Sequence, residues 1–177
     1  MASKLRVDSI LPVDGAPTNG GGGIIQVQSV SKTDTDSFTS GTPTDIPGLS
    51  VSITPKFSTS KILLMTAITF GYSTTNTDLH VRFLRDSTPI FIGDSAGSRT
   101  SDSYGFQHVG HNFADDRSEN VSLTFLDSPS TTSAVTYKVQ VETNRGGTIY
   151  VNRTHTDTDD ENYNRSASSL TVMEVSA

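Results

Sequence analysis

The sequence predicts an all-β fold, a jelly-roll-like antiparallel β-sandwich preceded by an extended N-terminal arm. Short stretches that alternate apolar and polar residues are separated by turn-forming Gly, Pro, Asn, Asp and Ser residues. No window shows a sustained helical period with caps. With 177 residues, 33% hydrophobic and 7% aromatic, the chain suits one domain with a thin core.

Residues 1–23 form the expected arm. Leu5 and Val7 alternate with charged residues, and Ile10 and Leu11 follow before a proline. So short a segment cannot bury these side chains against itself. The bland interpretation is a frayed tail, but a solvated tail has little use for so many aliphatic residues. We therefore expect these four residues to dock onto a partner.

A run of four glycines, 20–23, ends the arm. A phosphate-binding loop would open a helix and carry Gly-Lys-Ser/Thr, whereas a strand-like segment follows here. The run is therefore interpreted as a hinge, and residues 24–177 as the β-sandwich domain.

Residues 60–70, SKILLMTAITF, are predicted to form the central strand. Both parities of this stretch are apolar, so both faces of the strand need cover. The facing sheet would cover one face and a neighbouring subunit the other. The residues expected in the core and the trimer interface are Leu63, Met65, Ile68 and Phe70.

The other expected strands follow from alternation in the same way. In chain order they are residues 24–30, 49–53, 79–83, 90–92, 104–113, 121–125, 135–141, 149–151 and 170–175. Asn144 to Gly147 are interpreted as a hairpin turn into the strand at 149–151. Polar loops lie at 71–78, 93–103, 114–118 and 153–165, and loops at the end of a rigid sandwich are where recognition usually occurs.

The loop at 153–165 is the candidate receptor-contact loop, with Asp157, Asp159, Asn162, Tyr163 and Asn164 as its residues. An aromatic face beside amide side chains suits stacking on a sugar ring while its hydroxyls are hydrogen-bonded. The alternative is a tyrosine that folds back and pins its own loop.

Metal sites receive no assignment. The cluster of Asp157, Asp159, Asp160 and Glu161 offers oxygen ligands, but it lacks the glycine and the closing glutamate of a calcium loop. A solvated acidic loop is favoured over calcium binding. His108 and His111 lie three apart, which places them on opposite faces of a strand, so surface or interface roles are favoured.

Composition argues against several functions. The net charge is -6 and no basic stripe occurs, which argues against nucleic-acid binding. The absence of cysteine excludes disulfides and thiol nucleophiles and fits assembly in a reducing cytoplasm. The longest apolar run is about half the length of a membrane-spanning helix, so no membrane insertion is expected. Asp115, Asp116, Glu119 and Asp127 lie in turn-like settings, and we expect no enzymatic activity and no cofactor.

Three stretches resemble one family. The leader SKLRVDSILPVDGAPTNGGGGIIQV, the segment SLTFLDSPSTTSAVTYKV and the end ASSLTVMEVSA are similar to virion structural and tail-fibre-like proteins of marine tailed bacteriophages of the cyanophage type. They cover somewhat under half of the chain, and no catalytic motif carries over.

The resemblance implies a homotrimer of jelly-roll-like domains, similar in outline to the heads of C1q and tumour necrosis factor. It implies a virion protein, made in the host bacterial cytoplasm, that docks to other virion proteins by its arm. As a tail-fibre or appendage component it would contact host-surface glycan or protein. The alternative is a capsid decoration protein of the same fold that stabilises the particle.

Overall fold

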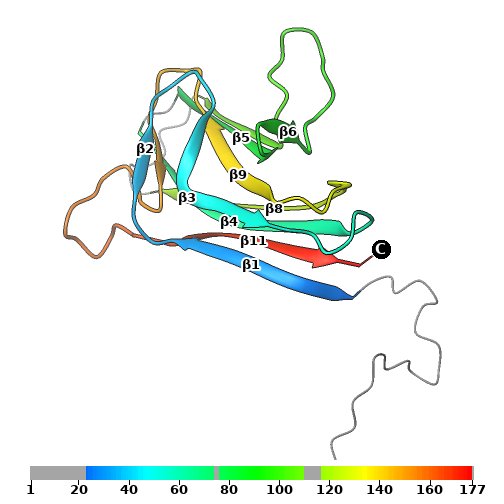
Figure 1. Ribbon diagram of the computed structural model, residues 1–177. Coiled ribbons are helices and arrows are strands. Elements are labelled where there is room, and N and C mark those ends of the chain that lie inside the picture. The colour runs from blue at the N-terminus through cyan, green and yellow to red at the C-terminus, as the bar shows by residue number, and fades with distance from the viewer. Residues whose placement is uncertain (1–22, 74–75, 110–116, 177) are drawn as a thin grey trace, which may run out of the picture.

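Two antiparallel sheets stack face to face in the computed structural model, which describes residues 23–73, 76–109 and 117–176 (Figure 1). All regular secondary structure in these ranges is β-strand, which confirms the all-β prediction. Sheet A contains β1 (Ile24–Lys32), β2 (Asp36–Phe38), β4 (Lys61–Tyr72), β8 (Ser118–Asp127), β10 (Ile149–Val151) and β11 (Ser168–Val175). Sheet B contains β3 (Thr44–Ile53), β5 (Asn76–Arg85), β6 (Thr88–Ile90), β7 (Tyr104–Val109) and β9 (Val135–Glu142).

The strand order is that of a jelly roll. Without the three-residue strands β2, β6 and β10, eight strands remain, and sheet A runs β1-β11-β4-β8 while sheet B runs β3-β9-β5-β7. Numbered one to eight along the chain, these orders are 1-8-3-6 and 2-7-4-5, the double Greek key of this fold. The predicted fold class is therefore confirmed.

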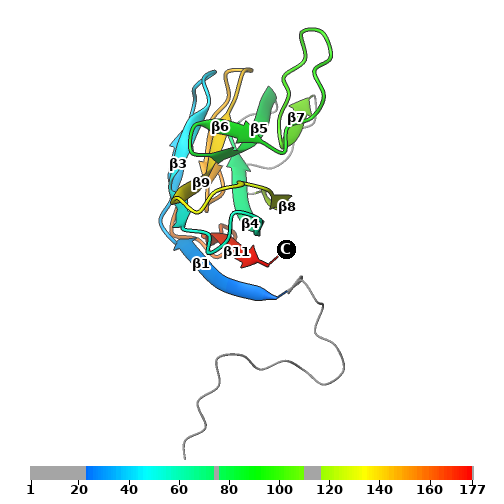
Figure 2. The ribbon, with the colours of Figure 1, turned by 45° about the vertical axis from the view of Figure 1, so that its right-hand side comes forward.

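β4 is the central strand of sheet A, as predicted. Residues 62–71 pair with β8 along one edge. The other edge pairs with β11 over residues 61–67 and with β10 over residues 70–72. Figure 2 shows β1 and β11 beside β4 in this layer. Each partner lies far away in sequence, so alternation within β4 could not identify it.

The core lies between the sheets and is built from the inward parity of each strand. On β4, Leu64, Ile68 and Phe70 are fully buried, and they pack with side chains of β5 and β9 such as Phe83 and Tyr137. The four residues predicted for the core and the interface therefore lie on two opposite faces of β4. Ile68 and Phe70 belong to the core, whereas Leu63 and Met65 point outward, and their place in a subunit interface stays a prediction.

Some local predictions were wrong. Asn144 to Gly147 do not make a hairpin, because β9 lies in sheet B and β10 in sheet A, so this turn carries the chain between the sheets. The strand expected at 90–92 is β6 at Thr88–Ile90, and Phe91 follows it with a φ of 55°, which is not a strand conformation. The short strand β2 was not predicted. No helix in the described ranges is long and apolar enough to span a membrane.

Candidate interaction surfaces

The outer face of sheet A, which points away from the core, is apolar at one end. The pairing register places Leu126, Leu63, Met173 and Val27 in one row across β8, β4, β11 and β1. Leu126 is 51% exposed and Val27 is 49% exposed, and Met65 in the next row is 43% exposed. Exposed apolar side chains that gather on one sheet face are typical of an interaction surface.

The same face becomes hydroxyl-rich toward its other end. Met65 lies between Thr124 and Thr171, and the row after it contains Ser122, Ala67 and Ser169. These side chains line a shallow hollow of about 300 Å³ that includes Met173. The apolar row is therefore confined to the end of the sheet where β1 begins.

The β10–β11 loop (residues 152–167) contains the predicted receptor-contact residues, and Asn152 anchors it. The side chain of Asn152 is fully buried and donates hydrogen bonds to the carbonyl oxygens of Lys32 (2.8 Å) and Asp34 (2.9 Å). The oxygen of the Asn152 side-chain amide accepts a hydrogen bond from the Ser168 hydroxyl. Asn152 has a φ of 63°, a left-handed conformation that asparagine tolerates better than most residues.

A second set of contacts stiffens the first part of the loop. The Arg153 guanidinium carbon lies 3.8 Å from the centroid of the Tyr150 ring, a cation–π contact. The same guanidinium donates to the carbonyl oxygens of Thr154 (3.1 Å) and His155 (2.8 Å). The His155 ring stacks on Tyr150 with centroids 5.6 Å apart. The loop therefore leaves the sandwich from a fixed base.

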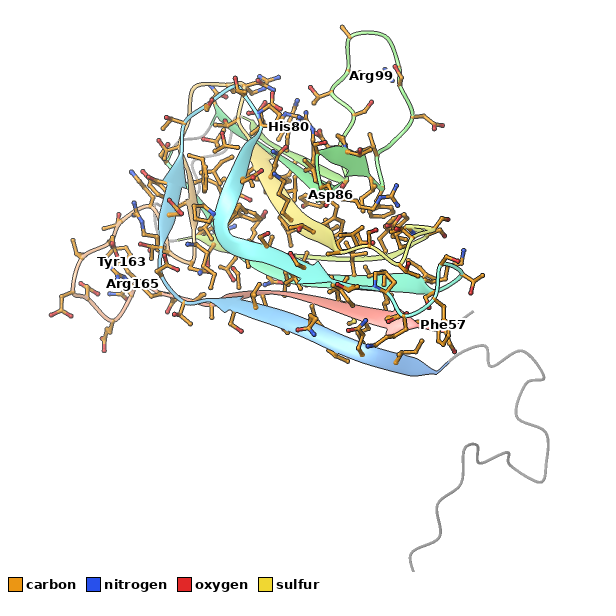
Figure 3. All side chains as sticks on the ribbon, viewed as in Figure 1. Phe57, His80, Asp86, Arg99, Tyr163 and Arg165 are labelled. Carbon is orange, nitrogen blue, oxygen red and sulfur yellow. The ribbon has the colours of Figure 1, made fainter. Side chains whose placement is uncertain are left out.

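An ion pair and a pair of hydrogen bonds shape the tip of the loop, which contains Tyr163 and Arg165 (Figure 3). Arg165 donates to both carboxylate oxygens of Asp157, at 2.9 and 2.7 Å, and this pairing holds the pKa of Asp157 below its usual value. The Asp160 carboxylate accepts from the backbone N–H and the side-chain amide of Asn162. Both carboxylates thus already have donors inside the loop.

The tip encloses an open hollow of about 460 Å³. Four of the five predicted residues line it, namely Asp157, Asp159, Tyr163 and Asn164. Thr158, Asp160 and Arg165 complete the lining. Asn162 does not line it, because its amide is turned toward Asp160. Tyr163 is half-buried and its backbone N–H donates to the Asp160 carbonyl oxygen. The structure therefore brings most of the predicted contact residues together.

Metal and catalytic candidates find other roles. In residues 23–73, 76–109 and 117–176, no group of three or more carboxylate, imidazole or thiol side chains could hold a metal ion. Asp127 is buried and accepts from Arg85 and from the Tyr137 hydroxyl, so it is a structural carboxylate. Glu119 is exposed on β8. His111, Asp115 and Asp116 lie outside the described residues.

The arm lies outside the described residues except for Gly23. Docking by Leu5, Val7, Ile10 and Leu11 therefore stays a prediction. Gly23 marks where the arm joins the domain: its carbonyl oxygen accepts from the backbone N–H of Ser176 at 2.9 Å. The arm thus meets the domain beside the end of β11.

Sequence reasoning missed a buried charged network on the outer face of sheet B. Both ring nitrogens of His80 lie near carboxylate oxygens, Nδ1 at 2.5 Å from Asp102 and Nε2 at 3.2 Å from Asp78. Arg82 pairs with Asp102 and with Glu142, each at 2.9 Å. The alternation of Asp78, His80 and Arg82 on one parity was a signal, but their partners come from distant segments.

No protein-family model and no curated protein sequence matches the chain. Similar solved structures include the D431N mutant VP2 protein of infectious bursal disease virus in T=1 particles, with 11% identity and a TM-score of 0.43 over 98% of this chain and 40% of that chain. The infectious bursal disease virus Gx strain structure has 12% identity and a TM-score of 0.44 over 98% and 43%. The chain therefore spans about two fifths of the length of these solved chains.

Proposed function

We propose that this chain is a non-enzymatic virion structural protein, a tail-fibre or appendage component. Residues 1–23 dock to other virion proteins, and a trimeric β-sandwich is displayed for attachment to host-surface glycan or protein. The observation that carries the proposal is the placement of the arm junction and the β10–β11 loop at opposite ends of the domain. The resemblance of the leader to phage virion proteins supports the same conclusion.

The separation of the two ends follows from β1. Its first residue, Ile24, follows the arm junction, and its last residue, Lys32, pairs with Ser168 at the base of the β10–β11 loop. The eight steps between the first and the last of its nine residues, at about 3.3 Å each, place the two ends roughly 26 Å apart. Figure 1 shows the loop projecting at the left, at the opposite end of β1 from Ile24. A domain held at one end would therefore present this loop outward.

The apolar end of the outer face of sheet A supports self-association. Leu63, Met173 and Val27 lie in one row there, on a chain that is otherwise rich in Ser and Thr. Burial against sister subunits would remove this surface from water. Three linked subunits raise apparent affinity for a repeated receptor by about two to four orders of magnitude without any new contact type.

Immunogold labelling of intact particles of the virus that encodes the chain tests the proposal. An antibody against residues 24–176 is expected to label the tail or its fibres. Label spread over the head would replace the attachment role by capsid decoration, and particles without label would refute the virion assignment. Particles assembled with an arm-deleted chain should carry no label, since docking needs residues 1–23.

A further inference from the structure

The outer face of sheet B contains a polar cleft that neither the sequence nor the proposed receptor-contact loop accounts for. It has a volume of about 590 Å³, and four separate segments form it. The loop after β6 contributes Ser98, Arg99 and Thr100, the turn after β9 contributes Asn144 and Arg145, and β5 and β7 contribute Asp78, His80 and Gln107. Figure 3 shows Arg99 on the loop that projects beyond His80.

The carboxylate at the floor of the cleft, Asp78, is already hydrogen-bonded by groups of the protein. One oxygen of Asp78 accepts from the Thr143 hydroxyl and from the backbone N–H groups of Asn144 and Arg145, at 2.9, 2.7 and 3.2 Å. The other oxygen faces His80. Burial raises the pKa of Asp78, but these hydrogen bonds outweigh burial and keep it below its usual value. Asp78 therefore stays charged and has its donors already, so it is not available to a ligand.

Of the two guanidinium groups of the cleft, that of Arg99 is exposed and that of Arg145 is held only in a loose ion pair. Arg99 is exposed and has no carboxylate partner among the described residues. Arg145 is 45% exposed and forms an ion pair with Asp78, in which its Nε lies 4.0 Å from the carboxylate, beyond hydrogen-bond distance. Guanidinium groups bind carboxylate and sulfate groups through paired hydrogen bonds. Two of them in one cleft are notable on a chain with a net charge of -6.

The remaining lining favours a ligand with many hydroxyl groups. Ser98, Thr100, Gln107 and Asn144 supply hydroxyl and amide groups that both donate and accept hydrogen bonds. Among the described residues that line the cleft, His80 contributes a ring and none contributes an aliphatic side chain. Recognition here would depend on charge and hydrogen bonding rather than on stacking or apolar contact. An acidic saccharide has both charged groups and hydroxyl groups, whereas an acidic peptide such as polyglutamate offers carboxylates without hydroxyl groups.

We infer that this cleft binds an acidic glycan, with Arg99 and Arg145 contacting its carboxylate or sulfate groups. The inference rests on the proposed attachment function and adds a second contact site to it. The acidic tip of the β10–β11 loop would repel such a glycan, so the two sites recognise different parts of a host surface.

Binding of the purified full chain to defined polymers tests the inference. The probes are polygalacturonate for carboxylate groups, dextran sulfate for sulfate groups, neutral dextran, and polyglutamate as an acidic peptide. At least one acidic polysaccharide should bind, more weakly as salt rises, and more tightly than polyglutamate. Equal binding of neutral dextran, tighter binding of polyglutamate, or no binding of either acidic polysaccharide would overturn the inference.

Variants locate the binding. Arg99→Gln combined with Arg145→Gln should weaken binding about tenfold or more, because both charged contacts are lost. Lys56→Gln combined with Lys61→Gln removes the same charge far from the cleft and serves as the control. Equal losses in the two double variants would show diffuse electrostatic attraction and overturn the inference. Particle labelling is independent of this assay, so failure of the cleft leaves the virion proposal standing.

Discussion

Aspartate placed at Leu64 or at its neighbour Met65 separates the two faces of the central strand. Leu64 is fully buried between Val172 and Phe125 on the adjacent strands, whereas Met65 is 43% exposed between two threonines. The two substitutions introduce the same charge one residue apart. Their effects should therefore differ only because the strand turns the two side chains to opposite faces.

The magnitude at Leu64 follows from its surroundings. Removing a fully buried leucine costs about 2–5 kcal/mol, and an unpaired buried carboxylate costs several kcal/mol more. The sum approaches the whole stability of an ordinary domain, about 5–15 kcal/mol. Leu64→Asp should therefore give insoluble or unfolded protein at pH 7. At Met65 the carboxylate stays hydrated, so urea unfolding of the variant should change by about 1 kcal/mol or less.

Light scattering coupled to size exclusion gives the second measurement. The unmodified chain should elute at about three times its 18.9 kDa mass, and Met65→Asp should elute as a folded monomer. A soluble, folded Leu64→Asp would refute the assignment of the strand faces. A trimeric Met65→Asp would refute the outer face of sheet A as the subunit interface, and a monomeric unmodified chain would refute the trimer itself.

Three further substitutions test the described contacts. Gly71→Ala should lower the melting temperature strongly, because an added Cβ would lie 2.3 Å from the Arg153 carbonyl oxygen, whereas Gly23→Ala meets only a contact at 3.8 Å and should be tolerated. Asn152→Ala should cost about 2–4 kcal/mol in urea unfolding, since it removes buried hydrogen bonds at a positive φ; an unchanged midpoint would contradict the anchor. Glu174→Gln should cost about 1–3 kcal/mol at pH 7. Burial raises the pKa of Glu174, but the hydrogen bonds to its carboxylate lower it by more, so the net pKa lies below the usual value. The stability that the ionised Glu174 contributes is therefore present above the unfolded pKa and is lost as pH falls through the folded pKa. The stability difference between Glu174→Gln and the unmodified chain should shrink in acid, and a difference that grows there would contradict the assignment.

Glu174 shows why such a residue escapes sequence analysis. It is fully buried on β11, yet none of the ion pairs among the described residues includes it. Its carboxylate accepts from the Gln26 amide at 2.6 Å and from the backbone N–H of Lys56 at 2.7 Å. These donors lie more than a hundred residues away in the chain, so nothing near Glu174 in the sequence identifies its partners. The strand pattern places Glu174 on the same inward face as Leu170 and Val172, but it does not show which groups satisfy the carboxylate there.

The sequence by itself determined most of the longer strands and the two apolar faces of β4. Alternation is a local property, because successive side chains of a strand point to opposite faces whatever lies beside it. Residues 60–70 therefore carried their own evidence for a central, two-sided strand. The loop was also recognisable as residues 153–165, since its polar residues interrupt the alternation.

Only the tertiary structure decided which segments meet. The turn at 144–147 resembles a hairpin locally, but the chain crosses there from sheet B to sheet A. Asn152 anchors its loop through carbonyl groups of residues 32 and 34, and the cleft near Arg99 is assembled from four separate segments. Pairing between sheets and the convergence of distant loops depend on contacts across long stretches of chain, whereas residue periodicity reports only on neighbours.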